Sequence, residues 1–311
     1  MATATRDAFG EALLRIGADE RIVVLTGDLR DSTRTEDFGE TYPDRFFDVG
    51  IAEHNLLGVA AGLALSGKIP WAASFSCFVT GRFEVVRVTV AYQEANVRIV
   101  GTHAGIGVGE DGYSQMALED MAGIRALPNV AIVNPCDAVE TERAVEYLVD
   151  HVGPAFLRLT RQKVDDVNGE GYRFEFGRAV QLRDGSDVAI VATGAAVQEA
   201  LKAADALAGD GVSARVLNVH TIKPLDEDAV LAAASDCRAV VTVEDHSAWG
   251  GLGSAVAELL ATRTDGASAP LRIIGTRTFG ESGTSEELYE KFGLSGARVA
   301  ATTRAFVEEL A

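Results

Sequence analysis

Short apolar runs alternate along the chain with longer segments in which apolar residues recur every three or four positions. In the first half, each short run predicts a strand, at 21–26, 46–49, 71–75, 97–101, 130–133 and 156–159. The segments with helical spacing lie between these runs, at 53–66, 79–92 and 138–149. Strands that alternate with helices are typical of a mainly parallel sheet with helices on its faces.

A second series of the same kind follows a short polar stretch. Residues 163–172 contain several aspartate, asparagine and glycine residues, which is typical of a connection between domains. Beyond it, we predict strands at 188–192, 214–219, 239–243 and 271–274, and a closing helix at 295–310. The pattern therefore predicts an α/β fold of two domains, each a mainly parallel sheet flanked by helices. The domains are expected at 1–165 and 187–311, with a linker at 166–186.

Charge and hydropathy limit the expected partners. The chain has 28 Lys plus Arg residues against 46 Asp plus Glu, a formal net charge of −18. This charge repels phosphate backbones, so nucleic acid is not an expected partner. No segment reaches the roughly 18 consecutive apolar residues of a membrane span, and the charged N-terminus does not fit a secretory signal. Cys77, Cys136 and Cys237 are widely spaced, which predicts free thiols and a cytoplasmic protein.

The first candidate for chemistry is Glu53, in the motif Asp-Val-Gly-Ile-Ala-Glu-His-Asn at 48–55. Glu53 follows a predicted strand and begins a very apolar helix. The simplest interpretation is a first-turn carboxylate that the helix dipole stabilises. The alternative is a semi-buried carboxylate that binds a ligand, because a low-dielectric setting strengthens its hydrogen bonds.

Two further features lie downstream of Glu53. Phe75 and Phe78 stand at the end of a predicted strand, where ordinary core packing is the default interpretation. The glycine loop (residues 101–114) contains the run Gly-Ile-Gly-Val-Gly-Glu-Asp-Gly after Thr-His, and a helix is expected after it, from Ala117. Its glycines let the backbone approach a ligand closely, although a bare glycine pattern also fits any strand-to-helix loop.

Together, the motif at 48–55, the two phenylalanines and the glycine loop resemble the pyrimidine-binding half of transketolase-like thiamine diphosphate enzymes. The resemblance covers nearly the whole chain, from about residue 6 to the C-terminal helix. It implies that Glu53 is catalytic: it contacts N1′ of the cofactor's aminopyrimidine and promotes removal of the thiazolium C2 proton. One departure is Gly81, where many transketolases have a tyrosine. The residues that the resemblance assigns to the cofactor are Glu53, Ile51, Phe75 and Phe78.

The same resemblance implies a substrate-binding set. It places His103 near the phosphate end of the substrate and Asp111 near a donor hydroxyl. Arginine forms bidentate bonds to phosphate, although each arginine or serine of the set, taken alone, fits an ordinary surface position. At another substrate position, transketolases have a histidine where this chain has Gln115, and an amide cannot carry imidazole's proton or charge. The full set is Arg6, Ser32, His103, Asp111, Gln115 and Arg161.

The half of such enzymes that binds the diphosphate and a metal ion has no counterpart in this sequence. No His, Cys and carboxylate set has metal-ligand spacing, so no metal site is predicted in this chain. Gly209-Asp210-Gly211 lies where a turn is expected, and residues 250–253 lack the full pattern of a dinucleotide site. His220 and His246 are predicted to be structural or interfacial.

These features predict one subunit of a split transketolase. An N-terminal transketolase subunit would supply the diphosphate-binding domain, bind Mg²⁺ (or Ca²⁺) and complete the thiamine diphosphate site, in a heterotetramer with two copies of each subunit. The implied reaction transfers a two-carbon ketol unit from a ketose, expected to be a sugar phosphate, to an aldehyde. Two alternatives stay open. One is the β subunit of a 2-oxo acid dehydrogenase E1, or an acyloin or deoxyxylulose phosphate synthase-like enzyme. The other is a non-catalytic scaffold subunit.

Overall fold

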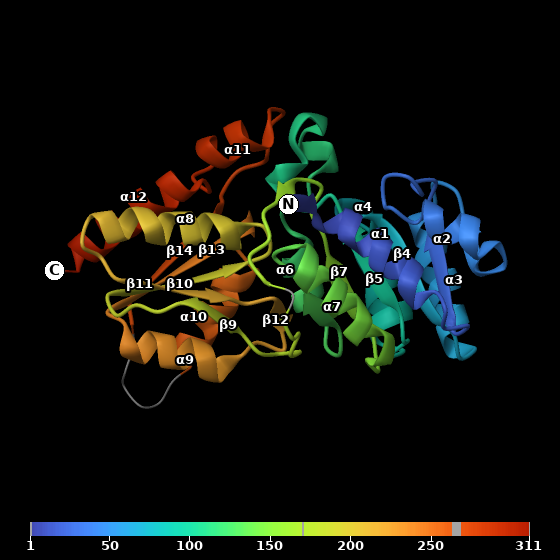
Figure 1. Cartoon of the computed structure of the whole chain (residues 1–311). Helices are drawn as coiled ribbons and strands as arrows, with labels where there is room; N and C mark the ends of the chain where they lie inside the picture. The colour runs from blue at the N-terminus through green and yellow to red at the C-terminus, as the bar shows by residue number, and fades with distance from the viewer. Residues whose placement is uncertain (1, 170, 263–268, 311) are drawn as a thin grey trace.

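The sheet of the N-terminal domain has seven strands (Figure 1). The computed structural model describes residues 2–169, 171–262 and 269–310. In spatial order the strands are β12 (Thr221–Lys223), β6 (Ala131–Val133), β7 (Ala155–Arg158), β5 (Arg98–Thr102), β4 (Ile69–Phe75), β2 (Ile22–Thr26) and β3 (Phe46–Asp48). β12 pairs antiparallel with β6, and the other neighbours pair parallel. The six strands predicted in this half are confirmed.

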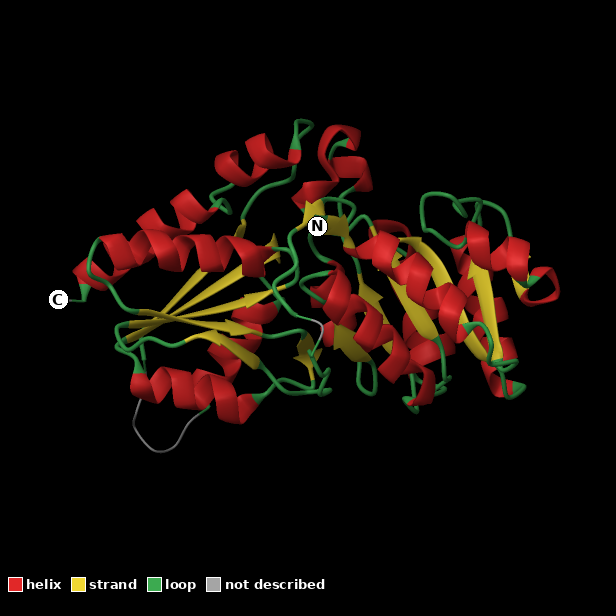
Figure 2. Cartoon of the chain, viewed as in Figure 1, coloured by secondary structure: helices red, strands yellow, loops and turns green. Residues whose placement is uncertain are grey.

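Helices cover both faces of this sheet (Figure 2). One face is covered by α1 (Thr5–Ile16), α2 (Glu36–Thr41) and α7 (Ala138–Asp150), and the other by α3 (Glu53–Leu65) and α6 (Asp120–Arg125). Alternate strand residues reach the two faces: Trp71 packs with the first group and Ala72 with the second. The helix predicted from Glu53 is therefore confirmed, and its apolar side supports one face of the sheet.

The helix predicted at 79–92 is wrong as a single element. The segment folds as α4 (Ser76–Thr80), α5 (Phe83–Val85) and the π-helical turn η2 (Val86–Ala91). The break falls at Arg82, whose φ of −96° and ψ of 42° are not helical, directly after Gly81. The apolar spacing continues across the break, because Val79, Val86 and Val90 are all buried. Periodicity therefore did not reveal where the backbone departs from a helix.

The C-terminal domain has a five-stranded sheet. Its strands, in spatial order, are β14 (Leu271–Thr276), β13 (Ala239–Ser247), β10 (Val188–Thr193), β11 (Ala214–Asn218) and β9 (Val180–Arg183). β9, which the apolar pattern did not predict, pairs antiparallel, and the others pair parallel. Figure 1 shows α8 (Ala196–Gly209) and α12 (Gly296–Glu309) on one face, and α9 (Glu227–Asp236) and α10 (Leu252–Ala261) on the other. The predicted strands and the closing helix of this half are confirmed.

The two domains share a core and several backbone contacts. β12 lies in the C-terminal half of the sequence but extends the N-terminal sheet. One apolar cluster runs from α3 and α6 to residues of α9 and α10, such as Val230 and Val256. The polar stretch 163–172 begins with β8 (Lys163–Val164), which pairs with β1 (Thr3–Ala4). The backbone amides of Val167 and Asn168 then donate to the carboxylate of Asp137. The start of this stretch is thus fixed by the N-terminal domain.

His220 and His246 are buried where the domains meet, as predicted. His246 Nε2 lies 3.6 Å from Oδ1 of Asp120, and the His220 carbonyl accepts from the amide of Asn134.

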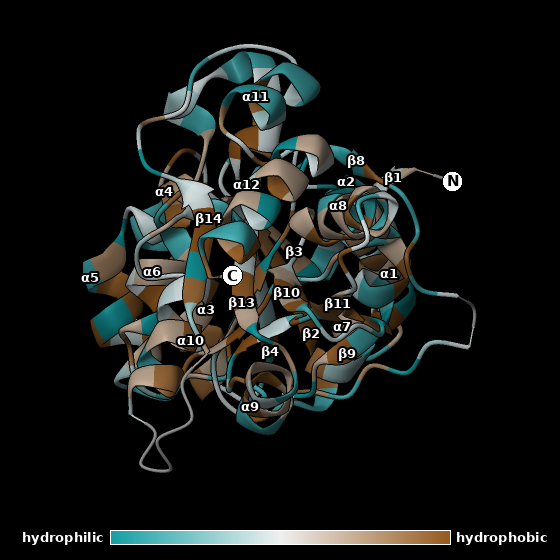
Figure 3. Cartoon of the chain, turned by 90° about the vertical axis from the view of Figure 1, so that its left-hand side faces the viewer, coloured by the Kyte–Doolittle hydropathy of each residue, from teal (hydrophilic) through white to brown (hydrophobic). Residues whose placement is uncertain are grey.

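Figure 3 shows apolar positions concentrated on the central strands and on the inner sides of the helices. Among the described residues, no helix is long and apolar enough to cross a membrane.

Candidate functional site

Glu53 is the first residue of α3 and is 5% exposed. The preceding turn contains Gly50, whose φ of +74° lies in the left-handed region that favours glycine. The hydroxyl of Ser74, on β4, donates to Glu53 Oε1 over 3.1 Å. A buried carboxylate needs hydrogen-bond donors, because it has lost those of water. Glu53 is thus both a first-turn residue of α3 and a buried carboxylate, and ligand binding by it stays a prediction.

An aromatic stack stands beside this carboxylate. Phe75, the last residue of β4, lies parallel to Phe78 of α4, with ring centroids 5.3 Å apart and an interplanar angle of 13°. The imidazole of His103 also stacks on Phe75, with ring centroids 3.6 Å apart. Since Phe75 directly follows Ser74, the end of β4 connects Glu53 to the aromatic stack.

His103 is held as a neutral imidazole. Burial, followed by the charges of Arg6 and Arg161, lowers the pKa of His103 to about 3. Its Nε2 lies 3.0 Å from Nη1 of Arg6, and because arginine can only donate, Nε2 is the acceptor. The proton is therefore on Nδ1, which donates to the Thr102 hydroxyl over 2.9 Å. That hydroxyl donates to the Ser74 carbonyl over 3.3 Å, so Ser74 also supports the orientation of His103.

The substrate-binding candidates lie around His103. Nη1 of Arg6 donates to the Ser32 carbonyl over 3.0 Å. Arg161 Nη1 lies 2.9 Å from Oδ2 of Asp111 and donates to a carbonyl of the glycine loop over 3.0 Å. Arg6 Nε is buried without a hydrogen-bond partner among the described residues. Burial and the nearby Arg34 and Arg161 cations lower the pKa of Arg6. Oδ1 of Asp7 lies 3.7 Å from this Nε, too far for a hydrogen bond. A cationic donor without a hydrogen bond, beside other cations, is suited to bind an anion.

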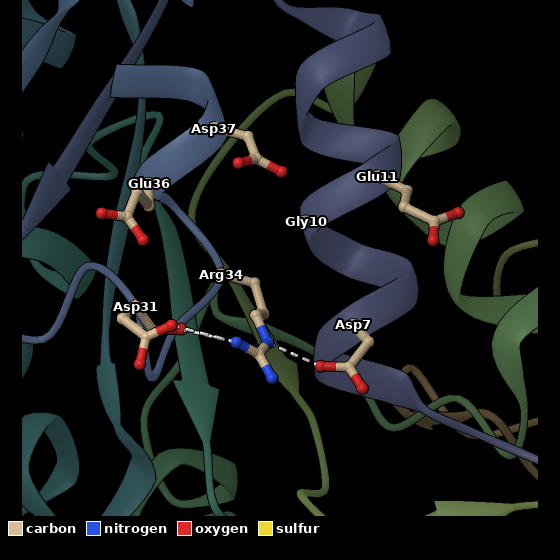
Figure 4. Close-up of a pocket in the computed structure, with 7 residues that line it drawn as sticks. All are labelled: Asp7, Gly10, Glu11, Asp31, Arg34, Glu36 and Asp37. Atoms are coloured by element: carbon tan, nitrogen blue, oxygen red, sulfur yellow. Dashed lines mark hydrogen bonds and ion pairs between the residues drawn. The ribbon is translucent and has the colours of Figure 1, made fainter. Parts of the chain in front are cut away.

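Arg34 does not take part in that set. It lies in a pocket of about 280 Å³ between α1 and α2, lined mainly by carboxylates (Figure 4). Its Nε donates to Asp7 over 2.7 Å and its Nη1 to Asp31 over 3.1 Å. The Asp7 contact is the main reason that the pKa of Arg34 is raised. Two carboxylates therefore hold Arg34, whereas among the described residues Arg161 is paired with Asp111 alone, and Arg6 has only a longer ion pair with Asp7, at 3.7 Å.

Two predicted residues stand apart from these contacts. Ile51 is 84% exposed, so within this chain it forms no part of a closed pocket. Gln115 is half-buried at the end of the short turn η4 (Tyr113–Gln115), and its side-chain amide donates to Ser114 over 3.3 Å. The backbone carbonyl of Gln115 accepts a hydrogen bond from the thiol of Cys77 over 3.4 Å. In the sequence, Cys77 lies between Phe75 and Phe78. Gln115 thus lies near the aromatic stack but bonds locally.

Sequence reasoning missed Ser74, Thr102 and Cys77, which orient the candidate residues. Ser74 and Thr102 end strands directly before Phe75 and His103, and that position is the available signal for both. Burial raises the pKa of the Cys77 thiol to about 12, so it remains a hydrogen-bond donor rather than a nucleophile. The helix expected from Ala117 begins at Asp120.

The remaining glycine motifs are structural. Gly211 has a φ of +79° in the turn after α8, as predicted for 209–211. Near residues 250–253, the carboxylate of Glu244 on β13 accepts hydrogen bonds from the amides of Leu252 and Gly253 at the start of α10. Those amides are therefore not free to bind a phosphate. The described residues include no group of three or more His, Cys, Asp or Glu placed to hold a metal ion.

Comparisons with known protein families agree with the geometry. Residues 1–166 match the transketolase pyrimidine-binding domain, and residues 177–299 match the transketolase C-terminal domain. The chain is 43% identical over 297 residues to the 6-deoxy-6-sulfo-D-fructose transketolase subunit SqwH of Clostridium sp., covering 94% of this chain and 91% of that protein. It is 37% identical to an apulose-4-phosphate transketolase subunit of Phocaeicola vulgatus, covering 98% of each.

Solved structures give the same result. A structure described as a split gene transketolase, inactive beta4 tetramer, superposes with a TM-score of 0.90 at 42% identity and covers 98% of both chains. The transketolase of Leishmania mexicana superposes with a TM-score of 0.84 at 28% identity, over 99% of this chain but 46% of that one. The two-domain α/β fold is therefore shared with both.

Proposed function

Because the chain belongs to the transketolase family, we propose that it is one subunit of a split enzyme that transfers a two-carbon ketol unit from a ketose to an aldehyde. The observation that carries the proposal is the buried Glu53 carboxylate beside the Phe75–Phe78 stack. Relatives that this chain matches along nearly their whole length are named as transketolase subunits. In the full-length transketolase structure, the corresponding region is about half of the chain.

The residues fit the pyrimidine half of thiamine diphosphate. A buried carboxylate accepts a hydrogen bond from a protonated ring nitrogen, and an aromatic ring stacks on a planar heterocycle. When bound, thiamine diphosphate supplies the electron sink for breaking and forming the bond to the ketol unit. Glu53 holds a hydrogen bond to the aminopyrimidine and favours proton movement there. Ile51, exposed in this chain, contacts the cofactor once the partner encloses it.

The substrate end of the site is the group around His103. Arg6, whose Nε makes no hydrogen bond among the described residues, and Arg161 bind the phosphate of a sugar substrate, and Ser32 adds a hydroxyl donor. Neutral His103 lies near the phosphate end of the substrate, and Asp111 binds a hydroxyl group of the donor sugar. The low pKa of His103 keeps the ring uncharged near neutral pH, so it orients rather than attracts the substrate.

A partner subunit with the diphosphate-binding domain completes the site. It binds Mg²⁺ and the diphosphate of the cofactor, in a heterotetramer with two copies of each chain. Cytoplasmic location agrees with the free cysteines Cys77, Cys136 and Cys237.

The proposal predicts that the purified chain has no ketol transferase activity alone and gains it with its partner. The groups that bind the diphosphate and the metal ion are assigned to the partner, so the affinity of the chain alone for thiamine diphosphate should be weak. Calorimetry with thiamine diphosphate and Mg²⁺, followed by a transfer assay with and without the N-terminal subunit, checks this. Micromolar, Mg²⁺-dependent binding to the chain alone would contradict the split design.

Gln115 is expected to select a sugar other than the common pentose phosphates. Two relatives are named for 6-deoxy-6-sulfo-D-fructose and apulose 4-phosphate, so subunits of this type do act on unusual sugars. An amide in place of imidazole changes which hydroxyls find a partner, and an unmatched buried polar group costs about 1–3 kcal/mol. Gln115→His should therefore shift the preference toward xylulose 5-phosphate with ribose 5-phosphate by about 5- to 150-fold.

The assay compares kcat/KM of the assembled enzyme for that pair and for 6-deoxy-6-sulfo-fructose. Gln181→His, on the exposed side of β9, is the matched control for adding an imidazole. If the kcat/KM of the unmodified enzyme is already higher for the pentose phosphate pair than for 6-deoxy-6-sulfo-fructose, Gln115 does not set the substrate preference.

A further inference from the structure

The glycine loop is built into the core of the C-terminal domain. Within it, the turn η3 (Ile106–Asp111) buries Ile106 and Val108 in the same apolar cluster as residues of that domain, such as Val243 and Leu288. Helix α11 (Ser285–Lys291) packs against this turn, and the Ser285 hydroxyl donates to the Gly107 carbonyl over 2.9 Å. A segment that the fold assigns to one domain is therefore shaped by the other.

Asp245, on β13, makes the central contact. Its Oδ1 accepts the amide of Ile106 over 2.8 Å, and its Oδ2 accepts the amide of Gly107 over 3.3 Å. The hydroxyl of Tyr289, on α11, donates to the same Oδ2 over 2.8 Å. Nη2 of Arg158, at the end of β7, donates to the Asp245 carbonyl over 2.8 Å. The carboxylate is buried and fully engaged, so its position is fixed from both domains.

The positive-φ glycines of the loop face this support. At Gly105, with φ of +85°, an added Cβ would lie 2.1 Å from Oδ2 of Asp245. At Gly109 and Gly112, also with positive φ, the nearest atoms belong to Gly283 and Ser282 of the C-terminal domain. The loop conformation thus requires glycine for its backbone angles and, at Gly105, for contact with the Asp245 carboxylate.

We propose that Asp245 is a positioning residue for sugar recognition: by holding the amides of Ile106 and Gly107, it sets the conformation of η3, which positions Asp111 and, through Asp111 and the Val108 carbonyl, the guanidinium of Arg161. The proposal rests on the proposed function. Asp111 ends the turn that Asp245 anchors, and Arg161 is held by Asp111 and by the Val108 carbonyl of the same turn. Glu53 and the Phe75–Phe78 stack make their contacts within the N-terminal domain. Loss of the anchor should therefore affect recognition of the sugar more than the chemistry at the cofactor.

Asp245→Asn keeps the side-chain volume but turns an NH₂ group toward one of the backbone amides. Glu244→Gln is the matched control: Glu244 is equally buried on the same strand, but it accepts amides at the start of α10 in its own domain. Both variants are assembled with the partner subunit. Two ketol donors are compared. One is the ketose that the unmodified enzyme uses better, either xylulose 5-phosphate or 6-deoxy-6-sulfo-fructose. The other is hydroxypyruvate, which carries the same ketol unit but no sugar chain or phosphate, and which releases CO₂ when that unit is transferred.

For Asp245→Asn, we expect kcat/KM for the ketose to fall 10- to 100-fold, mainly through KM, with hydroxypyruvate turnover within 3-fold of the unmodified enzyme. Amide hydrogen exchange at 105–112 should rise at least 10-fold. In Glu244→Gln, amide hydrogen exchange should rise at 251–253 instead. The ratio of kcat/KM for the ketose to kcat/KM for hydroxypyruvate should stay within 3-fold of that of the unmodified enzyme. If Asp245→Asn does not fold, Ser285→Ala and Tyr289→Phe should change the donor ratio in the same direction, by a smaller factor.

Equal losses for both donors in Asp245→Asn, or the same change of donor ratio in Glu244→Gln, would overturn the positioning role. Unchanged exchange at 105–112 would show that Asp245 does not anchor the loop. If the unmodified complex uses neither donor, the proposed function fails, whereas the exchange result still decides whether Asp245 holds the loop.

Discussion

Replacing Glu53 with glutamine is expected to lower turnover of the assembled enzyme by at least about 100-fold while leaving fold and assembly intact. The amide has nearly the same shape, and its oxygen can still accept from the Ser74 hydroxyl. What is lost is the negative charge in a buried position, which favours proton movement at the aminopyrimidine. A positioned proton-transfer group contributes about 10²- to 10⁴-fold, so a loss of 100-fold corresponds to about 2.7 kcal/mol of transition-state stabilisation.

Single-turnover and steady-state assays of the complex measure this loss, with assembly checked by size. Glu199→Gln is the matched control, because Glu199 is also a buried glutamate in the first turn of a helix, α8, where it accepts the amide of Gly296. It should leave turnover unchanged. The turnover of Ser74→Ala should lie between those of Glu53→Gln and Glu199→Gln, because this change removes one neutral hydrogen-bond donor and leaves the Glu53 charge. Near-normal turnover of Glu53→Gln in an assembled complex would instead support a scaffold subunit.

The sequence predicted the strands of both sheets well, because buried parallel strands are short, continuous apolar runs. It failed where structure depends on contacts rather than on pattern. β12 is three residues long and exists because it meets the edge of β6 in the other domain. The break at Arg82 lies within an apolar spacing that both a straight helix and a broken one can bury.

The candidate site shows the same division. The motifs that the sequence offered place Phe75 and His103 at the ends of the neighbouring parallel strands β4 and β5, and Glu53 at the start of the helix that follows β3. The carboxyl ends of these parallel strands lie along one edge of the sheet. The sequence could not supply their hydrogen-bond partners. Ser74 is an ordinary strand serine until its distance to Glu53 is known, and Asp245 is 139 residues from Ile106. Partners so distant in sequence leave no local pattern.

Breaking the buried ion pair that joins α6 to β7 within the N-terminal domain should have the largest effect on stability. Arg158 Nε donates to Oδ2 of Asp120 over 2.9 Å, and both side chains are almost fully buried. The Ser76 hydroxyl also donates to that oxygen over 2.6 Å. Although burial raises the pKa of Asp120, Arg158 and its other partners hold that pKa below its ordinary value. A carboxyl with a lowered folded pKa stabilises the protein above its unfolded pKa, and that contribution is lost as pH falls through the folded pKa.

Asp120→Ala is expected to lower the free energy of unfolding by about 3–5 kcal/mol, because it leaves the Arg158 guanidinium buried and unpaired. Arg158→Met should also destabilise, since it leaves the Asp120 carboxylate without its cation. The double variant should lose less than the sum of the two single losses, by more than about 1 kcal/mol, because neither charge is then left without the other. Arg143→Ala, which breaks an exposed pair with Glu146 on α7, is the control and should cost less than about 0.5 kcal/mol. Urea denaturation of the four variants measures these differences. Losses that simply add would mean that Asp120 and Arg158 act through separate neighbours rather than as a pair.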